Sequence, residues 1–200
     1  YVCPEPRAEF YRHIDAVNVD LKAFRERFYY KITGSHLKPV LETLEYIKHE
    51  TNCWLEITTL IIPGENDSDE EIHELTEWVV NTLGPDVPIH FSAFHPDWKM
   101  LDINPTPPSS LIRARKIAIN NGAYYAYTGN IHDHKGSSTY CHQCSNTLIG
   151  RDWYTLKEWD LTEKGKCRQC GTICAGYFND QPGNWGNRTQ VVRMSHQGSF

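Results

Sequence analysis

The chain has 200 residues, of which 40% are hydrophobic and 22% charged, and its formal net charge is −5 at pH 7. This length fits one domain, or one domain with a small appendage, and the sequence contains no run of eighteen apolar residues for a membrane span. The acidic balance argues against nucleic acid as the partner, because phosphate-backbone sites need a basic face. We also expect a fragment that lacks its true amino terminus, since the chain starts at Tyr1 with a strand–helix connection already under way.

The first half of the chain alternates helix-like and strand-like segments. A proline-rich start predicts a short helix from Pro4 to about His13, and period-two alternation predicts a strand over residues 17–22. Apolar residues at helical spacing then predict a helix over 38–50, which is followed by a strand over 53–62.

The next elements continue the same order. Ser68 and Glu71 have capping-box spacing and predict the start of a helix that ends before Gly84-Pro85. A strand over 89–94 leads into His95-Pro96, a helix over 111–121 closes at Gly122, and a further strand covers 123–127.

The predicted strands are polar on one face only. Asn18, Asp20 and Lys22 alternate with aliphatic residues in the first strand, and Glu56 and Thr58 do so in the second. Parallel strands between two helical layers would be apolar on both faces. The pattern therefore predicts an α/β barrel wall with a wet lumen, in which all carboxyl ends meet at one rim.

Three side chains at this rim are candidate site residues. Asp20 could hold a cation or a ribose hydroxyl and Lys22 an anionic group, although a plain surface ion pair explains the same spacing. Lys22 also leaves open a barrel hydrolase or an aldolase-type barrel enzyme. His95 could position a ligand at the end of the third strand, or be a partly buried imidazole.

The strongest single motif is Cys141-x2-Cys144 followed, after twenty-two residues, by Cys167-x2-Cys170. Four thiolates from two tight turns predict a closed tetrahedral zinc site with a structural role, and a rubredoxin-like iron site would use the same ligands. Disulfides are disfavoured, since the cysteine usage fits a reducing, cytoplasmic setting. We interpret Cys174 as a small buried apolar residue, with an iron–sulfur role as the alternative.

The sequence from residue 132 onwards predicts a separate unit. We expect a linker over 132–139, a cysteine module over 140–178 and a poorly ordered tail over 179–200. Trp153, Tyr154 and Trp159 are predicted to form the module's small core. The alternative function of the chain is that of a non-enzymatic zinc-ribbon module that recognises a protein or nucleic acid.

Several motifs, taken in order, resemble a radical S-adenosylmethionine family. The nearest resemblance is to the radical enzyme of the AmmeMemoRadiSam system, which is related to pyruvate formate-lyase activating enzymes. The motifs are those of residues 1–6, 17–24, 58–67, 94–100 and 127–130, together with the two cysteine pairs.

The resemblance implies that residues 1–131 are the C-terminal part of a partial (β/α)6 TIM-like barrel, followed by a small zinc-ribbon-like module. It implies cofactor contacts for Asp20, Lys22 and His95, and adenine packing by the backbone of Leu60 to Ile62. Thr58 stands where activating enzymes can have an arginine. The family's Cys-x3-Cys-x2-Cys loop is absent from this sequence, so the ligands of a 4Fe–4S cluster would lie outside this chain, which alone would be inactive.

The resemblance also implies a chemistry. In this family a reduced 4Fe–4S cluster cleaves S-adenosylmethionine to a 5′-deoxyadenosyl radical, which abstracts a hydrogen atom from a substrate. The substrate here is unknown, with proteins among the candidates. A flavodoxin or ferredoxin would be the reductant, and Memo-type and AMMECR-type proteins would be partners.

Overall fold

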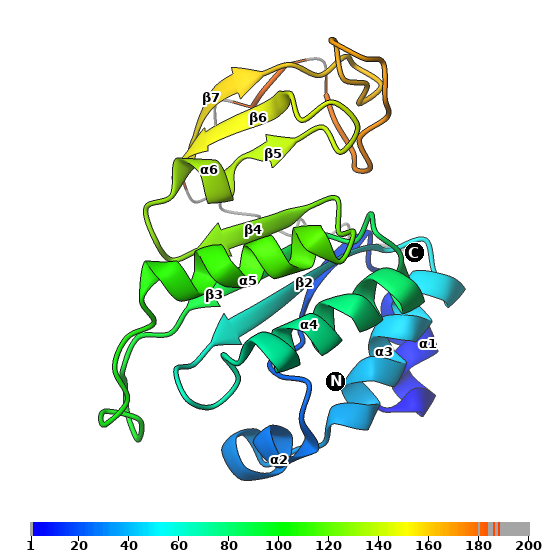
Figure 1. Cartoon of the computed structure of the whole chain (residues 1–200). Helices are drawn as coiled ribbons and strands as arrows, with labels where there is room; N and C mark the ends of the chain where they lie inside the picture. Colours follow the sequence, from blue (N-terminus) through cyan, green and yellow to red (C-terminus); the bar gives the residue numbers. More distant parts are fainter. Residues whose placement is uncertain (1, 180, 184–185, 187, 189–200) are drawn as a thin grey trace.

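Figure 1 shows the chain as a computed structural model, which describes residues 2–179, 181–183, 186 and 188. These residues form a four-stranded sheet and a three-stranded sheet. Within these ranges no helix combines the length and apolar character that a membrane crossing requires.

The larger sheet is parallel throughout and has the order β1-β2-β3-β4. Its strands are β1 (Ala16–Asp20), β2 (Trp54–Ile61), β3 (Ile89–Ala93) and β4 (Ala126–Gly129). The predicted parallel direction of the strands is therefore confirmed. The four strands form an open sheet, and no closed barrel is present in the described part of the chain.

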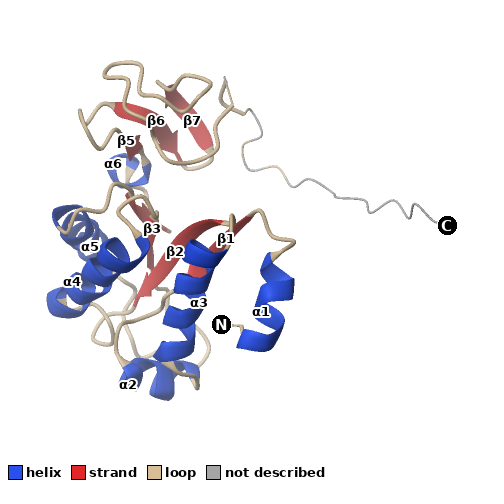
Figure 2. Cartoon of the chain, turned by 90° about the vertical axis from the view of Figure 1, so that its right-hand side faces the viewer, coloured by secondary structure: helices blue, strands red, loops and turns tan. Residues whose placement is uncertain are grey.

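Helices cover one face of this sheet, as Figures 1 and 2 show. The connecting helices are α3 (Leu37–Glu50), α4 (Asp69–Trp78) and α5 (Pro108–Asn120), while α1 (Pro4–Tyr11) packs beside α3. Residues of β2 alternate strictly between buried and half-buried, which confirms the predicted two-faced strand. The apolar face is the core, with Ile57, Ile89 and Phe91 fully buried.

Two helical segments contain π-turns. α2 (Glu26–Phe28) continues into η1 (Tyr29–Thr33), which ends at Gly34 with a φ of 65°, and α4 continues into η2 (Val79–Leu83). The predicted start of α4 is confirmed, because the Ser68 hydroxyl accepts a hydrogen bond from the Glu71 amide.

Some predicted boundaries are wrong by a few residues. β1 ends at Asp20 rather than residue 22, because side chains rather than strand partners bind the next two carbonyls. β4 begins three residues later than predicted, because the Ala123 amide still bonds to Ala118 at the end of α5. α5 begins earlier, at Pro108, since proline is tolerated in a first helical turn.

The second sheet is antiparallel and belongs to the cysteine module, which lies beyond β4 in Figure 1. It contains β5 (Thr139–Tyr140), β6 (Thr147–Asp152) and β7 (Thr155–Trp159), preceded by the short helix α6 (His134–Ser137). The predicted linker over 132–139 thus contains α6 and the first residue of β5. Most of the tail predicted to be poorly ordered lies outside the described residues.

The small core of the module differs from the predicted one. Leu148, Ile149 and Leu161 pack with the cysteines and with Tyr125 from the segment before β4. Trp159 contacts this cluster as predicted. The prediction is wrong for Trp153 and Tyr154, which are 60% and 68% exposed, because the turn between β6 and β7 carries them away from the core.

Candidate functional site

Buried polar side chains hold the carboxyl ends of β1 and β2 together. The Thr59 hydroxyl donates to the Leu21 carbonyl at 2.9 Å. Asn66 Nδ2 donates to the carbonyls of Lys22 at 2.6 Å and Leu60 at 2.9 Å, and Asn66 Oδ1 accepts from the Ile62 amide at 2.7 Å. Because Asn66 is only 3% exposed, these bonds have little competition from water.

A similar contact joins β2 to β3. The buried Thr106 hydroxyl donates to the Ile61 carbonyl at 2.5 Å and accepts from the Phe94 amide at 2.9 Å. The carboxyl ends of three neighbouring strands are therefore fixed by side chains from the loops that follow β2 and β3. The sequence interpretation missed Asn66 and Thr106, although each lies in the loop that follows a strand.

Asp20 and Lys22 lie together at this edge, as predicted. Lys22 Nζ lies 3.0 Å from Asp20 Oδ2, and both side chains are partly exposed. Asp20 is opposite Thr58 in the strand register, and the Thr58 hydroxyl donates to Asn18 Oδ1 at 2.8 Å. The Lys22 amide donates to the hydroxyl of Tyr29, and burial raises the pKa of that phenol to about 12.

The remaining predicted cofactor residues lie on or just after β2 and β3. Leu60 is half-buried on the polar face opposite Ser92, and Ile62 is buried just after β2. His95 is exposed two residues after β3. All six predicted residues thus lie toward the carboxyl ends of β1, β2 and β3, but within the described ranges no hydrogen bond joins His95 to the other five.

The middle of the polar face carries a second set of contacts. Glu56 Oε2 lies 2.7 Å from His90 Nε2, and Glu56 Oε1 accepts from Trp54 Nε1 at 3.0 Å. The hydrogen bond to His90 lowers the pKa of Glu56, against the opposing effect of burial. His90 stacks on Tyr127 of β4 with 5.0 Å between ring centroids. Alternation predicted the inward position of Glu56, and the same pattern could have identified His90.

The cysteine module covers part of this polar face. The hydroxyls of Tyr127 and Thr139 lie 2.9 Å apart, and the Arg151 guanidinium lies 5.8 Å from the Tyr127 ring centroid. Tyr177 reaches the ring of Trp54 on β2. The module therefore packs against the polar face of the sheet through Tyr127 of β4 and Trp54 of β2.

The four predicted cysteine ligands meet at one point. Their sulfur atoms all lie within 4.8 Å of one another, with 3.5 Å between Cys141 and Cys170 and 3.7 Å between Cys144 and Cys167. A disulfide needs about 2.05 Å, whereas tetrahedral zinc with bonds of about 2.3 Å sets sulfur atoms about 3.8 Å apart. None of the four cysteines forms a disulfide, and their separations fit a four-cysteine metal site.

The two cysteine turns have the same backbone hydrogen bonds. The Cys141 carbonyl accepts from the Ser145 amide and the Cys141 amide donates to the Asn146 carbonyl, both at 2.8 Å. Cys167 makes the equivalent bonds to the two residues at the same offsets, Gly171 and Thr172. Ser145 and Gly171 both adopt a positive φ, as turns of this tightness require. Cys174 is buried in the module core and lies outside the four-cysteine group, as predicted.

Comparisons with known proteins show which proteins this chain is similar to in sequence and in fold. No family model matches the chain. It is 40% identical to an uncharacterized protein of Methanocaldococcus jannaschii over 159 residues, which are 79% of this chain and 47% of that protein. It is 28% identical over 109 residues, 53% of this chain and 41% of that protein, to a candidate glycyl-radical enzyme activating enzyme of the same organism.

The fold also has a match among solved structures. A domain of the pyruvate-formate lyase-activating enzyme from Bacteroides vulgatus superposes with a TM-score of 0.56 at 16% identity, covering 64% of this chain and 75% of that one. The chain spans less than half the length of each of the two curated relatives described above. The chain therefore shares its fold with a domain of a pyruvate-formate lyase-activating enzyme and has distant sequence similarity to a candidate activating enzyme.

Proposed function

We propose that this chain is the cofactor-binding part of a radical S-adenosylmethionine enzyme of the glycyl-radical-activating type. The observation that carries the proposal is the fixed carboxyl edge of the parallel sheet, where Asp20 and Lys22 pair beside Thr58. In open α/β sheets, ligands bind outside the carboxyl ends of the strands.

The proposed roles of the residues follow from their chemistry. Asp20 and Lys22 offer opposite charges to the amino-acid end of the cofactor, which carries both an ammonium and a carboxylate. His95 can donate to the same ligand from the end of β3, which is separated from β1 by β2. Leu60 and Ile62 offer an apolar surface and backbone groups to the adenine, and Thr58 a hydroxyl.

The cofactor and a 4Fe–4S cluster together would supply the one-electron chemistry that forms a 5′-deoxyadenosyl radical. We propose that the cluster ligands lie outside this chain, which alone would not cleave the cofactor. We also propose membership of the AmmeMemoRadiSam system, a flavodoxin or ferredoxin reductant, Memo-type and AMMECR-type partners, and a cytoplasmic location.

The proposed role of the four-cysteine site is structural, with zinc as the metal and iron as the alternative. Four thiolates leave no open position for water or substrate. The sulfur separations and the matched turns around Cys141 and Cys167 support a tetrahedral metal site at these four cysteines.

Amide chemical shifts of the chain, titrated with S-adenosylmethionine, test the proposal. We expect perturbed amides at Asp20 and Lys22 and around Leu60 to Ile62, and unperturbed amides in β6 and β7. Shifts confined to the module, or none at saturating ligand, would contradict it. Iron–sulfur reconstitution followed by cofactor cleavage in this chain alone would show that the proposed absence of cluster ligands is wrong.

One observation favours a second function, recognition of another protein by a zinc-ribbon module. Trp153 and Tyr154 are exposed side by side at the turn between β6 and β7, an arrangement common at protein interfaces. If the substitution Trp153→Ala in the full chain abolished binding of a partner protein and left cofactor binding unchanged, this function would be supported. Binding of nucleic acid that weakens steeply with salt would instead favour the nucleic-acid version of this module.

A further inference from the structure

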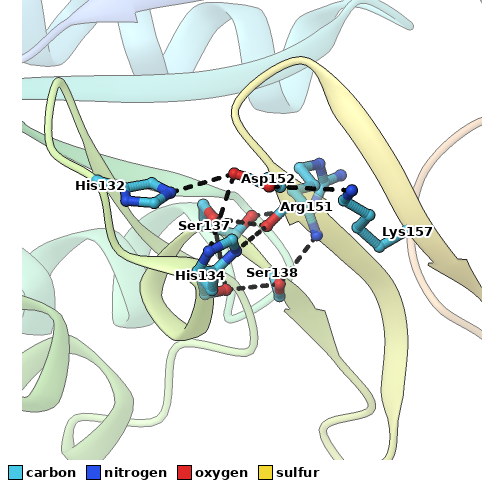
Figure 3. Close-up of polar contacts among 7 residues, drawn as sticks. All are labelled: His132, His134, Ser137, Ser138, Arg151, Asp152 and Lys157. Atoms are coloured by element: carbon cyan, nitrogen blue, oxygen red, sulfur yellow. Dashed lines mark hydrogen bonds and ion pairs between the residues drawn. The ribbon is translucent and has the colours of Figure 1, made fainter.

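A second group of metal-ligand side chains lies outside the four cysteines and the cofactor edge. His132, His134 and Asp152 each place one ligand atom within 4.8 Å of the other two (Figure 3). His132 follows β4, His134 begins α6 and Asp152 ends β6, so residues from two separate segments converge.

The distances between these ligand atoms are near those found between ligands of one metal ion. His132 Nε2 lies 3.1 Å and His134 Nε2 lies 3.8 Å from the same oxygen, Asp152 Oδ1. Ligand atoms bonded to one zinc ion at about 2.1 Å lie about 3.0–3.4 Å apart. The first of these separations falls within that range and the second exceeds it by about 0.4 Å.

Neighbouring groups orient the ligands. His134 Nδ1 lies 3.2 Å from the Arg151 carbonyl, which can only accept, so Nδ1 is the donor in this contact and Nε2 is the ring nitrogen left for a metal ion. The Ser138 hydroxyl donates to the His134 carbonyl at 2.6 Å and fixes the short helix (Figure 3). Lys157 lies 4.0 Å from Oδ2 of Asp152, which leaves Oδ1 to the histidines.

We propose that His132, His134 and Asp152 form a second metal site, for a borderline divalent ion such as Zn²⁺, Co²⁺ or Ni²⁺. Two imidazoles and one carboxylate suit these ions and leave further positions for water. The ordinary alternative is a surface histidine–carboxylate pair, and His13 with Glu9 is such a pair in this chain. The new site differs because two histidines share one carboxylate oxygen.

A bound ion would have a mechanical consequence. It would tie the segment after β4 to the hairpin of β6 and β7, and so fix the cysteine module against the larger sheet. This consequence does not depend on the identity of the cofactor at the carboxyl edge.

Cobalt titration of the full chain, with the cysteine site already filled with zinc, tests the proposal. We expect one further Co²⁺ per chain by equilibrium dialysis, with weak visible bands and without thiolate charge-transfer absorption. Binding should quench Trp153 fluorescence, because the His132 and Trp153 rings stack with 6.0 Å between centroids. A Trp153→Phe variant should bind cobalt equally and lose that part of the quenching.

Matched variants separate the site from general surface binding. His134→Gln and Asp152→Asn should each weaken cobalt binding at least about tenfold, while His13→Gln leaves it unchanged. Unchanged amide spectra outside the site would show that the variants fold. No further cobalt in the wild type, equal binding by the site variants, an equal loss in His13→Gln, or thiolate absorption from cobalt would each overturn the proposal.

Discussion

Replacing Asn66 with alanine tests whether buried side chains hold the carboxyl edge of the parallel sheet in place. The Asn66 side chain makes three hydrogen bonds, to the carbonyls of Lys22 and Leu60 and to the amide of Ile62. At about 1 kcal/mol net for each bond, and with all three backbone groups left without this partner, we expect the free energy of unfolding to fall by about 3 kcal/mol.

Urea unfolding measures the global loss, and hydrogen exchange at the Ile62 amide measures the local one. The Asn66→Asp variant keeps the acceptor for Ile62 but places a carboxylate against two carbonyl oxygens, so it should be at least as unstable as Asn66→Ala. Asn18→Ala is the matched control, since exposed Asn18 accepts one hydrogen bond from Thr58, and it should cost less than about 1 kcal/mol. An Asn66→Ala protein within about 0.5 kcal/mol of wild type, with Ile62 still protected, would refute the reasoning.

Three further predictions follow from the same structure. Removing the metal by chelation, or by the substitution Cys167→Ser, should abolish protection of the β6 and β7 amides from hydrogen exchange, while β2 and β3 stay protected. The reason is that the small module core of Leu148, Ile149 and Leu161 needs the metal. Protection of β6 and β7 that survives metal removal would contradict this prediction. Because hydrogen bonding to His90 lowers the pKa of Glu56, this pair's contribution is present above the unfolded Glu pKa of about 4.3 and is lost as pH falls through the folded value. Glu56→Gln should therefore cost about 1 kcal/mol at pH 7 and flatten the acid limb of the stability curve, and an unchanged limb would show that the pair is unimportant. In the described part of the chain β1 is an edge strand, so we expect concentration-dependent association by sedimentation; a monodisperse monomer that melts cooperatively would argue against it.

The sequence predicted the parts of the structure that depend on local periodicity. Alternation identified β2 and its polar face, the capping box located the start of α4, and the cysteine spacing identified all four members of the metal group. These signals are local because each depends on residues within one element or one tight turn.

Long-range contacts explain what the sequence did not predict. The roles of Asn66 and Thr106 depend on carbonyls that the parallel register brings beside them, and no periodic pattern marks such residues. Trp153 and Tyr154 looked like core residues by type, but the tight turn at Trp153, with a φ of 52°, directs them outwards. The proximity of His132 and His134 to Asp152 depends on how α6 packs against β6.

The central claim is that the carboxyl edge of the parallel sheet binds S-adenosylmethionine through Asp20. Its most direct test is the cofactor dissociation constant for wild type, Asp20→Asn and Asp15→Asn, measured by equilibrium dialysis. Asp15 is an exposed aspartate just before the amino end of the same strand, β1, and is the matched control. We predict saturable binding that Asp20→Asn weakens at least about tenfold, or about 1.4 kcal/mol, and that Asp15→Asn leaves unchanged. Equal affinities for the three proteins, or no binding by wild type, would contradict the claim.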